Sequence, residues 1–166
     1  MIPVNTPFLN GNEKKYLNDC IDTGWISSEG PYVQKFEKNI ANYIGQKYST
    51  ACSSGSAALD IAVKALGLKK DDEVIIPSFT IISCAQSLVK LGVKPVLVDS
   101  DYETFNMKVE DVEKKIRPQT KAIMIVHVFG LSADIDPILK IAKKYNLKII
   151  EDAAEVIGQE YKGILI

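Results

Sequence analysis

The most constraining feature of this 166-residue sequence is an alternation, from Thr50 onward, of short apolar runs with longer segments of helical periodicity. The runs are rich in β-branched residues, which is typical of strands that are buried on both faces. Such an alternation predicts an α/β fold with a mostly parallel sheet and right-handed crossover helices. The predicted strands are Tyr48–Ala51, Glu73–Ile76, Lys94–Val98, Ala122–Val126 and Lys148–Ile150.

Helices are predicted between these strands, and most of them end near a glycine or an asparagine. They cover Ser56–Leu66, Ile81–Leu91, Val109–Lys115 and Asp136–Tyr145. The first 45 residues differ, because they predict two helices, 12–22 and 31–43, around a loop that holds the only tryptophan. We therefore expect an N-terminal helical segment, residues 1–45, followed by a partial α/β domain, residues 46–166.

The sequence finishes on an apolar tail, Ile164–Ile166, directly after a predicted turn. An unpaired apolar strand is an unusual end for a domain, because its open edge favours aggregation. We therefore expect the sequence to be a fragment that is truncated at its C-terminal end.

Composition excludes several classes of partner. The formal net charge of −1 and the pI of about 5.9 give no reason to expect nucleic acid or an anionic membrane. No apolar run approaches the roughly 20 residues that cross a bilayer, and the first seven residues do not form a secretory leader pattern. The three cysteines lack the spacing of a disulfide framework or a zinc site, so we expect buried thiols in a cytoplasmic protein and no metal.

Parallel sheets bind ligands beyond the carboxyl ends of their strands. After the first predicted strand, the sequence Ser53-Ser-Gly-Ser-Ala57 leads directly into a helix. Gly55 lets the backbone approach a ligand closely, and the helix N–H groups with the Ser56 hydroxyl surround a phosphate favourably. A simple helix cap explains the same residues, and the sequence alone leaves both interpretations open.

Acidic residues follow the last predicted strand. A carboxylate at the end of a buried strand is costly unless it has a positive partner, so Asp152 is a candidate for holding a cationic ring nitrogen. The alternative is that Asp152 caps a following helix. His127, the only histidine, follows another strand and points toward the same edge of the sheet, as a candidate for substrate contact or as a hydrogen-bonded structural residue.

These residues belong to a series of motifs that resembles the DegT/DnrJ/EryC1/StrS family of sugar aminotransferases. The similarity extends from Pro3 to Gly163, and 24–38 with 98–105 are most similar to its perosamine-forming branch. The motifs are Gly24–Ser27, Ser53–Leu59, Asp71–Ser78, Gly92–Asp99, Thr120–Ile123, Val126–Gly130 and Ile150–Ala154.

The resemblance implies the fold-type-I aminotransferase architecture, pyridoxal 5′-phosphate as the cofactor, and active sites at the interface of a homodimer. The implied substrates are a nucleotide-linked keto sugar and glutamate. Residue by residue, Gly55, Ser56 and Ala57 match the positions that hold the cofactor phosphate. Asp152 matches the carboxylate that binds the pyridine nitrogen, and Glu155 matches a position near the ring hydroxyl.

The sequence departs from the family pattern at two places. Ile81 occupies the position of an aromatic residue that stacks on the cofactor ring, so the stacking contribution of about 0.5–1.5 kcal/mol is lost. The lysine that forms the Schiff base with the cofactor lies beyond Ile166, and Lys162, in the turn before that region, is no substitute. We therefore expect no catalytic residue in this fragment and no activity from it alone.

Two alternatives to an aminotransferase stay open. Some family members are pyridoxal phosphate-dependent sugar dehydratases, in which a histidine replaces the lysine. A truncated, non-catalytic remnant is the other possibility. The downstream coding sequence distinguishes the remnant from the enzyme.

Overall fold

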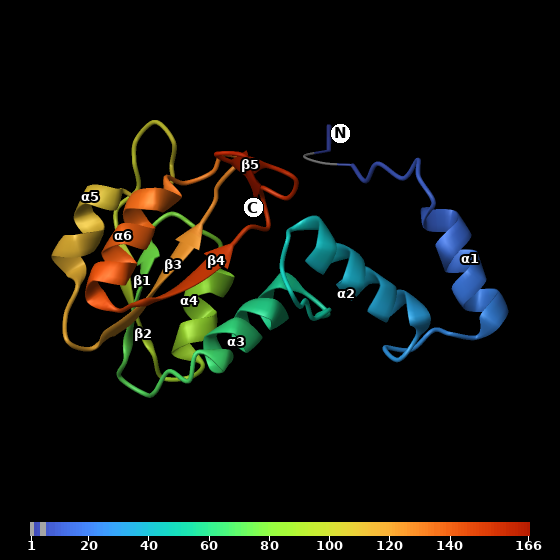
Figure 1. Ribbon diagram of the computed structural model, residues 1–166, viewed down its shortest axis with the longest axis horizontal. Helices are drawn as coiled ribbons and strands as arrows, with labels where there is room; N and C mark the ends of the chain where they lie inside the picture. Colours follow the sequence, from blue (N-terminus) through green and yellow to red (C-terminus); the bar gives the residue numbers. More distant parts are fainter. Residues whose placement is uncertain (1, 4–5) are drawn as a thin grey trace. The chain divides into compact units, whose positions relative to one another are not determined.

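A computed structural model describes residues 2–3 and 6–166 of the chain (Figure 1). Residues 1, 4 and 5, which belong to the segment where no leader is predicted, lie outside the described part. The chain forms two compact units that meet in the sequence between Ala51 and Cys52. Each unit is described by itself.

The first unit contains two helices, α1 (Glu13–Thr23) and α2 (Pro31–Tyr43). Gly24 ends α1 in the left-handed conformation at φ 74°, which glycine adopts without a steric penalty. Proline at the first position of α2 fits the helix, because that position has no intrahelical N–H bond to lose. The two helices agree with the sequence prediction to within one residue at each end.

The strand predicted at Tyr48–Ala51 is wrong, because these residues form no strand. Their polar groups bond to a helix instead of a sheet. The Ser49 hydroxyl donates to the Glu37 carbonyl at 2.5 Å, and the Ala51 N–H donates to Glu37 Oε1 at 2.9 Å. These bonds join the segment to α2, so residues 46–51 group with the helical unit.

The second unit is built on a four-stranded parallel sheet with the order β2-β1-β3-β4. This confirms the predicted α/β fold. Each remaining strand prediction is correct in position, although β1, β3 and β4 are longer than predicted. The strands are β1 (Glu73–Pro77), β2 (Lys94–Val98), β3 (Thr120–Val126) and β4 (Lys148–Asp152).

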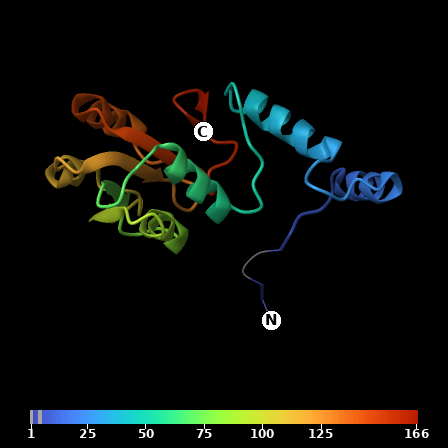
Figure 2. The same ribbon diagram turned by 90° about the horizontal axis from the view of Figure 1, so that it is seen from below.

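Helices cover both faces of the sheet, which Figures 1 and 2 show from two directions. On one face, α3 and α4 bury a core that includes Val63, Leu88 and Met124. On the other face, α5 and α6 bury a second core around Ile123 and Ile138. These helices and the single turn η1 cover Gly55–Ala65 (α3), Ile82–Val89 (α4), Val109–Val112 (α5), Glu113–Lys115 (η1) and Ile135–Tyr145 (α6).

The last residues form a hairpin, because β6 (Ile164–Leu165) pairs antiparallel with β5 (Glu160–Tyr161). The apolar tail is therefore paired, which contradicts the unpaired strand expected from the sequence. Lys162 and Gly163 form the turn at positive φ.

The expectation of buried thiols is right for Cys84 and wrong for Cys52, which is exposed. Cys84 lies inside the core that α3 and α4 share with the sheet. Among the described residues, no helix has the length and apolar character needed to cross a bilayer.

Candidate cofactor site

A cavity of about 290 Å³ lies at the carboxyl ends of β1, β3 and β4. From the central pair β1 and β3 the chain extends the sheet in both directions, to β2 on one side and β4 on the other. Open α/β sheets bind ligands at this switch point. The cavity is lined by Phe79, Thr80, Ile81, Val126, His127, Val128, Phe129, Asp152, Ala154 and Glu155. Four of the predicted site residues are thus brought together.

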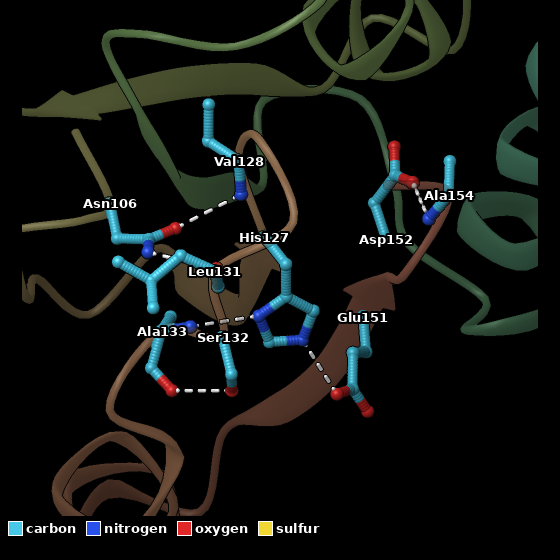
Figure 3. Close-up of polar contacts among 9 residues, drawn as sticks. All are labelled: Asn106, His127, Val128, Leu131, Ser132, Ala133, Glu151, Asp152 and Ala154. Atoms are coloured by element: carbon cyan, nitrogen blue, oxygen red, sulfur yellow. Dashed lines mark hydrogen bonds and ion pairs between the residues drawn. The ribbon is translucent and has the colours of Figure 1, made fainter. Parts of the chain in front are cut away.

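Asp152 is the last residue of β4 and is partly buried. Its Oδ1 accepts the Ala154 N–H at 3.2 Å, and its Oδ2 lies 3.4 Å from the Cys84 thiol (Figure 3 shows the first contact). No helix follows, because residues 153–159 form turns. The helix-cap alternative for Asp152 is therefore wrong, and its carboxylate lines the cavity.

Ile81 contributes an aliphatic wall to the same cavity. It directly precedes α4 in an extended conformation, and its carbonyl accepts the Cys84 N–H at 3.1 Å. The residue is 62% exposed. That exposure leaves an apolar surface beside Asp152 which a planar ring can cover by van der Waals contact.

His127 is 1% exposed, and both of its ring nitrogens have partners within the protein (Figure 3). The Ala133 N–H donates to Nδ1 at 3.0 Å, so Nδ1 is an acceptor. Nε2 therefore holds the proton of the neutral ring and donates to Glu151 Oε1 at 2.8 Å. This geometry fits a structural histidine, and a substrate contact by either nitrogen requires one of these bonds to break.

Glu155 lines the cavity and supports the loop after β3. Its Oε2 accepts the Phe129 N–H at 2.6 Å. Gln159 adds a second support, because its amide donates to the Gly130 carbonyl. Phe129 adopts a left-handed conformation at φ 53°, which side chains seldom occupy without such support. Glu155, assigned by resemblance to the ring hydroxyl, thus holds a cavity wall.

The predicted phosphate site lies at the first turn of α3. Ser54 caps this helix, since its hydroxyl accepts the Ala57 N–H at 3.2 Å. Ala57 therefore has a competing partner, and the better placed donors are the Gly55 and Ser56 N–H groups of the first turn. A Cβ built on Gly55 meets nothing within 4 Å, so the space in front of this turn is open. The residues fit a bound phosphate.

The first turn of α3 is linked to the cavity through α4. The Ser56 hydroxyl lies 3.0 Å from the Ser83 hydroxyl, and Ser83 is two residues beyond Ile81. A ligand that places a phosphate at α3 and a ring between Ile81 and Asp152 would therefore contact two neighbouring helices, α3 and α4. The two predicted halves of the site are neighbours in the fold.

Sequence reasoning missed Asn106, a buried side chain that fixes the loop after β3. Its Oδ1 accepts the Val128 N–H at 3.1 Å, and its Nδ2 donates to the Leu131 carbonyl at 3.0 Å (Figure 3). The sequence offers one signal: a polar residue between two apolar ones, Phe105 and Met107. That signal identifies no partner.

Three exposed phenylalanines also gather at this edge of the sheet, and no pattern in the sequence connects them. Phe79 packs against Phe105 and Phe129 with ring centroids 5.4 and 5.8 Å apart. Phe79 and Phe129 line the cavity. The patch therefore forms part of its mouth.

An α/β domain with a carboxylate at the end of a parallel strand, beside a serine–glycine helix start, has the arrangement of fold-type-I aminotransferases. The chain belongs to the DegT/DnrJ/EryC1/StrS aminotransferase family, which matches residues 7–166. This family uses pyridoxal phosphate.

Among curated proteins, the chain is 49% identical to the GDP-perosamine synthase of Caulobacter vibrioides over 162 residues. It is 48% identical to the GDP-perosamine synthase of Escherichia coli O157:H7. Both alignments cover 98% of this chain and 44% of the relative, so the chain spans less than half the length of these proteins. The similarity to the perosamine-forming branch is confirmed.

Solved structures agree with the fold. A 3-amino-5-hydroxybenzoic acid synthase superposes with a TM-score of 0.91 at 33% identity, covering 98% of this chain and 42% of that one. A GDP-4-keto-6-deoxymannose-3-dehydratase superposes with a TM-score of 0.92 at 28% identity, covering 99% and 44%. These two neighbours are therefore a synthase and a dehydratase.

We predict that replacing Asn106 with leucine, which is similar in volume, destabilises the loop after β3. The substitution leaves the buried Val128 N–H without its acceptor, and such a loss costs about 1–3 kcal/mol. Hydrogen exchange at the Val128 amide should become faster, and the free energy of unfolding should fall. Asn42→Leu, on the exposed surface of α2, is the control. Unchanged exchange at Val128 would contradict this role.

Proposed function

We propose that this chain forms the cofactor-binding part of a pyridoxal phosphate-dependent sugar-nucleotide aminotransferase. The observation that supports it best is the Asp152 carboxylate, which lines a cavity at the switch point of the sheet beside an exposed aliphatic wall. A carboxylate in that place suits a protonated ring nitrogen, because an opposite charge favours the protonated form.

The residues of this chain would hold the cofactor at two ends. The first turn of α3, at Gly55 and Ser56, would bind the phosphate through backbone N–H groups and a hydroxyl. Asp152 would bind the ring nitrogen, Ile81 would cover a ring face, and Glu155 would lie near the ring hydroxyl. When bound, pyridoxal phosphate supplies a ring that accepts electrons from the reacting carbon as a proton leaves.

The proposed reaction transfers an amino group from glutamate to a keto sugar that is linked to a nucleotide. The GDP-perosamine synthases support a GDP carrier, because their names specify it and their identity to this chain reaches 49%. We also propose that the full-length enzyme is a cytoplasmic homodimer. The family resemblance, in which active sites form between two subunits, supports this assembly.

A dehydratase of the same family is the second candidate, supported by the TM-score of 0.92 to a GDP-4-keto-6-deoxymannose-3-dehydratase. The higher identity of the perosamine synthases favours amino transfer. The product distinguishes the two, because only amino transfer places the glutamate nitrogen on the sugar. A non-catalytic remnant yields neither product.

We predict that the 166-residue chain alone has no aminotransferase activity. No lysine lines the described cavity, and Lys162 pairs with Asp136 beyond it. Adding pyridoxal phosphate should give no absorbance band that depends on one particular lysine of this chain. A band that one lysine substitution abolishes would overturn this prediction.

A chain extended through any downstream coding sequence should transfer ¹⁵N from labelled glutamate to a GDP-linked keto sugar.

We predict that Asp152→Ala in the active full-length enzyme lowers kcat by about a hundredfold or more, since an unprotonated ring is a poor electron acceptor. Asp152→Asn should restore little, because an amide has no negative charge. The measurement is steady-state kinetics with circular dichroism to verify folding. Glu151→Ala is the matched control, because Glu151 bonds to His127 and does not line the cavity. Near-normal turnover by Asp152→Ala would remove Asp152 from the site.

We predict that Gly55→Val weakens pyridoxal phosphate binding more than Ser56→Ala does. The open space at Gly55 admits a side chain without a clash in the protein, so valine would occupy the position proposed for the phosphate. Loss of the Ser56 hydroxyl removes one hydrogen bond, worth about 1.5–3 kcal/mol to a charged group. Cofactor retention after dialysis measures both effects. Equal retention by Gly55→Val and the parent, both folded, would place the phosphate elsewhere.

A further inference from the structure

The Cys84 thiol is a buried polar group that the proposed reaction does not use. Its side chain is 0% exposed, within the core formed by α3, α4 and the sheet. The sulfur nevertheless lies 3.4 Å from Asp152 Oδ2, on a carboxylate that lines the cavity. Cys84 therefore connects the core to Asp152, the residue proposed to bind the cofactor ring.

The proton on this thiol has a defined direction. The Thr80 hydroxyl donates to the Cys84 sulfur at 3.3 Å, so the sulfur accepts on that side. The thiol has one proton, and Asp152 Oδ2 is the acceptor on the other side. Burial raises the pKa of the Cys84 thiol to about 11, so the group remains a protonated donor near neutral pH.

Both oxygens of the Asp152 carboxylate are thereby held by donors from different elements. The Ala154 N–H, from the turn after β4, bonds to Oδ1, and Cys84, from α4, bonds to Oδ2. Two donors fix the rotation of the carboxylate plane. Because each carboxylate oxygen has about two lone-pair sites, acceptor capacity remains for a ligand in the cavity.

The same turn of α4 also forms the cavity wall. The Cys84 N–H donates to the Ile81 carbonyl at 3.1 Å, so the thiol and the aliphatic wall belong to one hydrogen-bonded turn. A shift of this turn therefore moves Ile81 and the thiol together. Ile81, which would cover the cofactor ring, and Cys84, which donates to Asp152, therefore move as one unit.

We propose that Cys84 is a positioning residue, which orients the Asp152 carboxylate toward the cofactor ring nitrogen through a relay from Thr80 to Cys84 to Asp152. This inference rests on the proposed function. A thiol suits the role because it is a weak, neutral donor that orients the carboxylate and leaves its negative charge in place.

The test compares three variants of the full-length polypeptide by titration with pyridoxal phosphate. Cys84→Ala should weaken affinity by roughly tenfold, as expected for losing a hydrogen bond to a charged group. Cys84→Ser should bind within about twofold of the parent, because a hydroxyl restores the donor. Ser87→Ala is the matched control: Ser87 is buried in the same helix, and its hydroxyl bonds only to the Cys84 carbonyl among the described contacts.

A second readout reports the ring itself and separates positioning from packing. With cofactor labelled with ¹⁵N at the ring nitrogen, NMR should give the protonated signal in the parent and in Cys84→Ser. Cys84→Ala should shift that signal toward the unprotonated form. Equal affinity and equal signals in Cys84→Ala and the parent would overturn the proposal, as would equal losses in Cys84→Ser and Cys84→Ala.

A measurement on the parent protein covers the case in which Cys84→Ala does not fold. The S–H stretching band of Cys84, identified as the band that Cys84→Ser removes, should lie at the lower frequency of a hydrogen-bonded thiol and should move when pyridoxal phosphate binds. A band at the frequency of an unbonded thiol, or one that the cofactor leaves in place, would overturn the relay. A folded parent that binds no pyridoxal phosphate would instead refute the proposed function.

Discussion

The adjacency of β1 and β3 at the centre of the sheet determines where this domain can bind a ligand. After β1 the chain passes through α4 to β2 on one side, and after β3 it passes through α6 to β4 on the other side. The connections therefore leave the carboxyl ends of β1 and β3 in opposite directions. No crossover covers the space between them, and the cavity lies there. Ile81 and His127 follow β1 and β3, and Asp152 ends β4, so the three residues share this edge.

Much of this arrangement follows from the sequence. Parallel strands buried on both faces need continuous apolar residues, so β1 to β4 are visible as β-branched runs. A parallel topology places their carboxyl ends together, which is why His127 and Asp152 could be predicted at one edge, whereas Ile81 and Glu155 were assigned by the family resemblance. The strand predicted at Tyr48–Ala51 failed because local apolar character says nothing about whether a partner strand exists.

The residues that sequence reasoning missed act through one or two long-range contacts each. Asn106 bonds to a loop more than twenty residues away, and Cys84 bonds to Asp152 across 68 positions. An asparagine in a loop or a cysteine in an apolar helix has many possible roles, and only the fold determines its partner. The sequence shows which hydrogen-bonding groups Asn106 and Cys84 have, whereas the fold determines which residues those groups bond to.

The last two residues of β4 show how the fold separates a structural carboxylate from a candidate functional one. Successive side chains of a strand point to opposite faces. Glu151 therefore faces the α5 and α6 side, where it bonds to His127, and Asp152 faces the α3 and α4 side, where it bonds to Cys84. The register of β4 against β3 pairs Ile125 with Glu151 and Val126 with Asp152.

A slip of that register by one residue would turn both carboxylates to the opposite faces of the sheet. Asp152 would then turn away from the face of the Cys84 thiol, and Glu151 would turn away from the face of His127. Ile149, which is partly buried, and Ile150, which is buried, oppose such a slip, because each packs against the core on its own face of the sheet. Apolar packing two residues earlier in the strand therefore determines which acid faces the cavity.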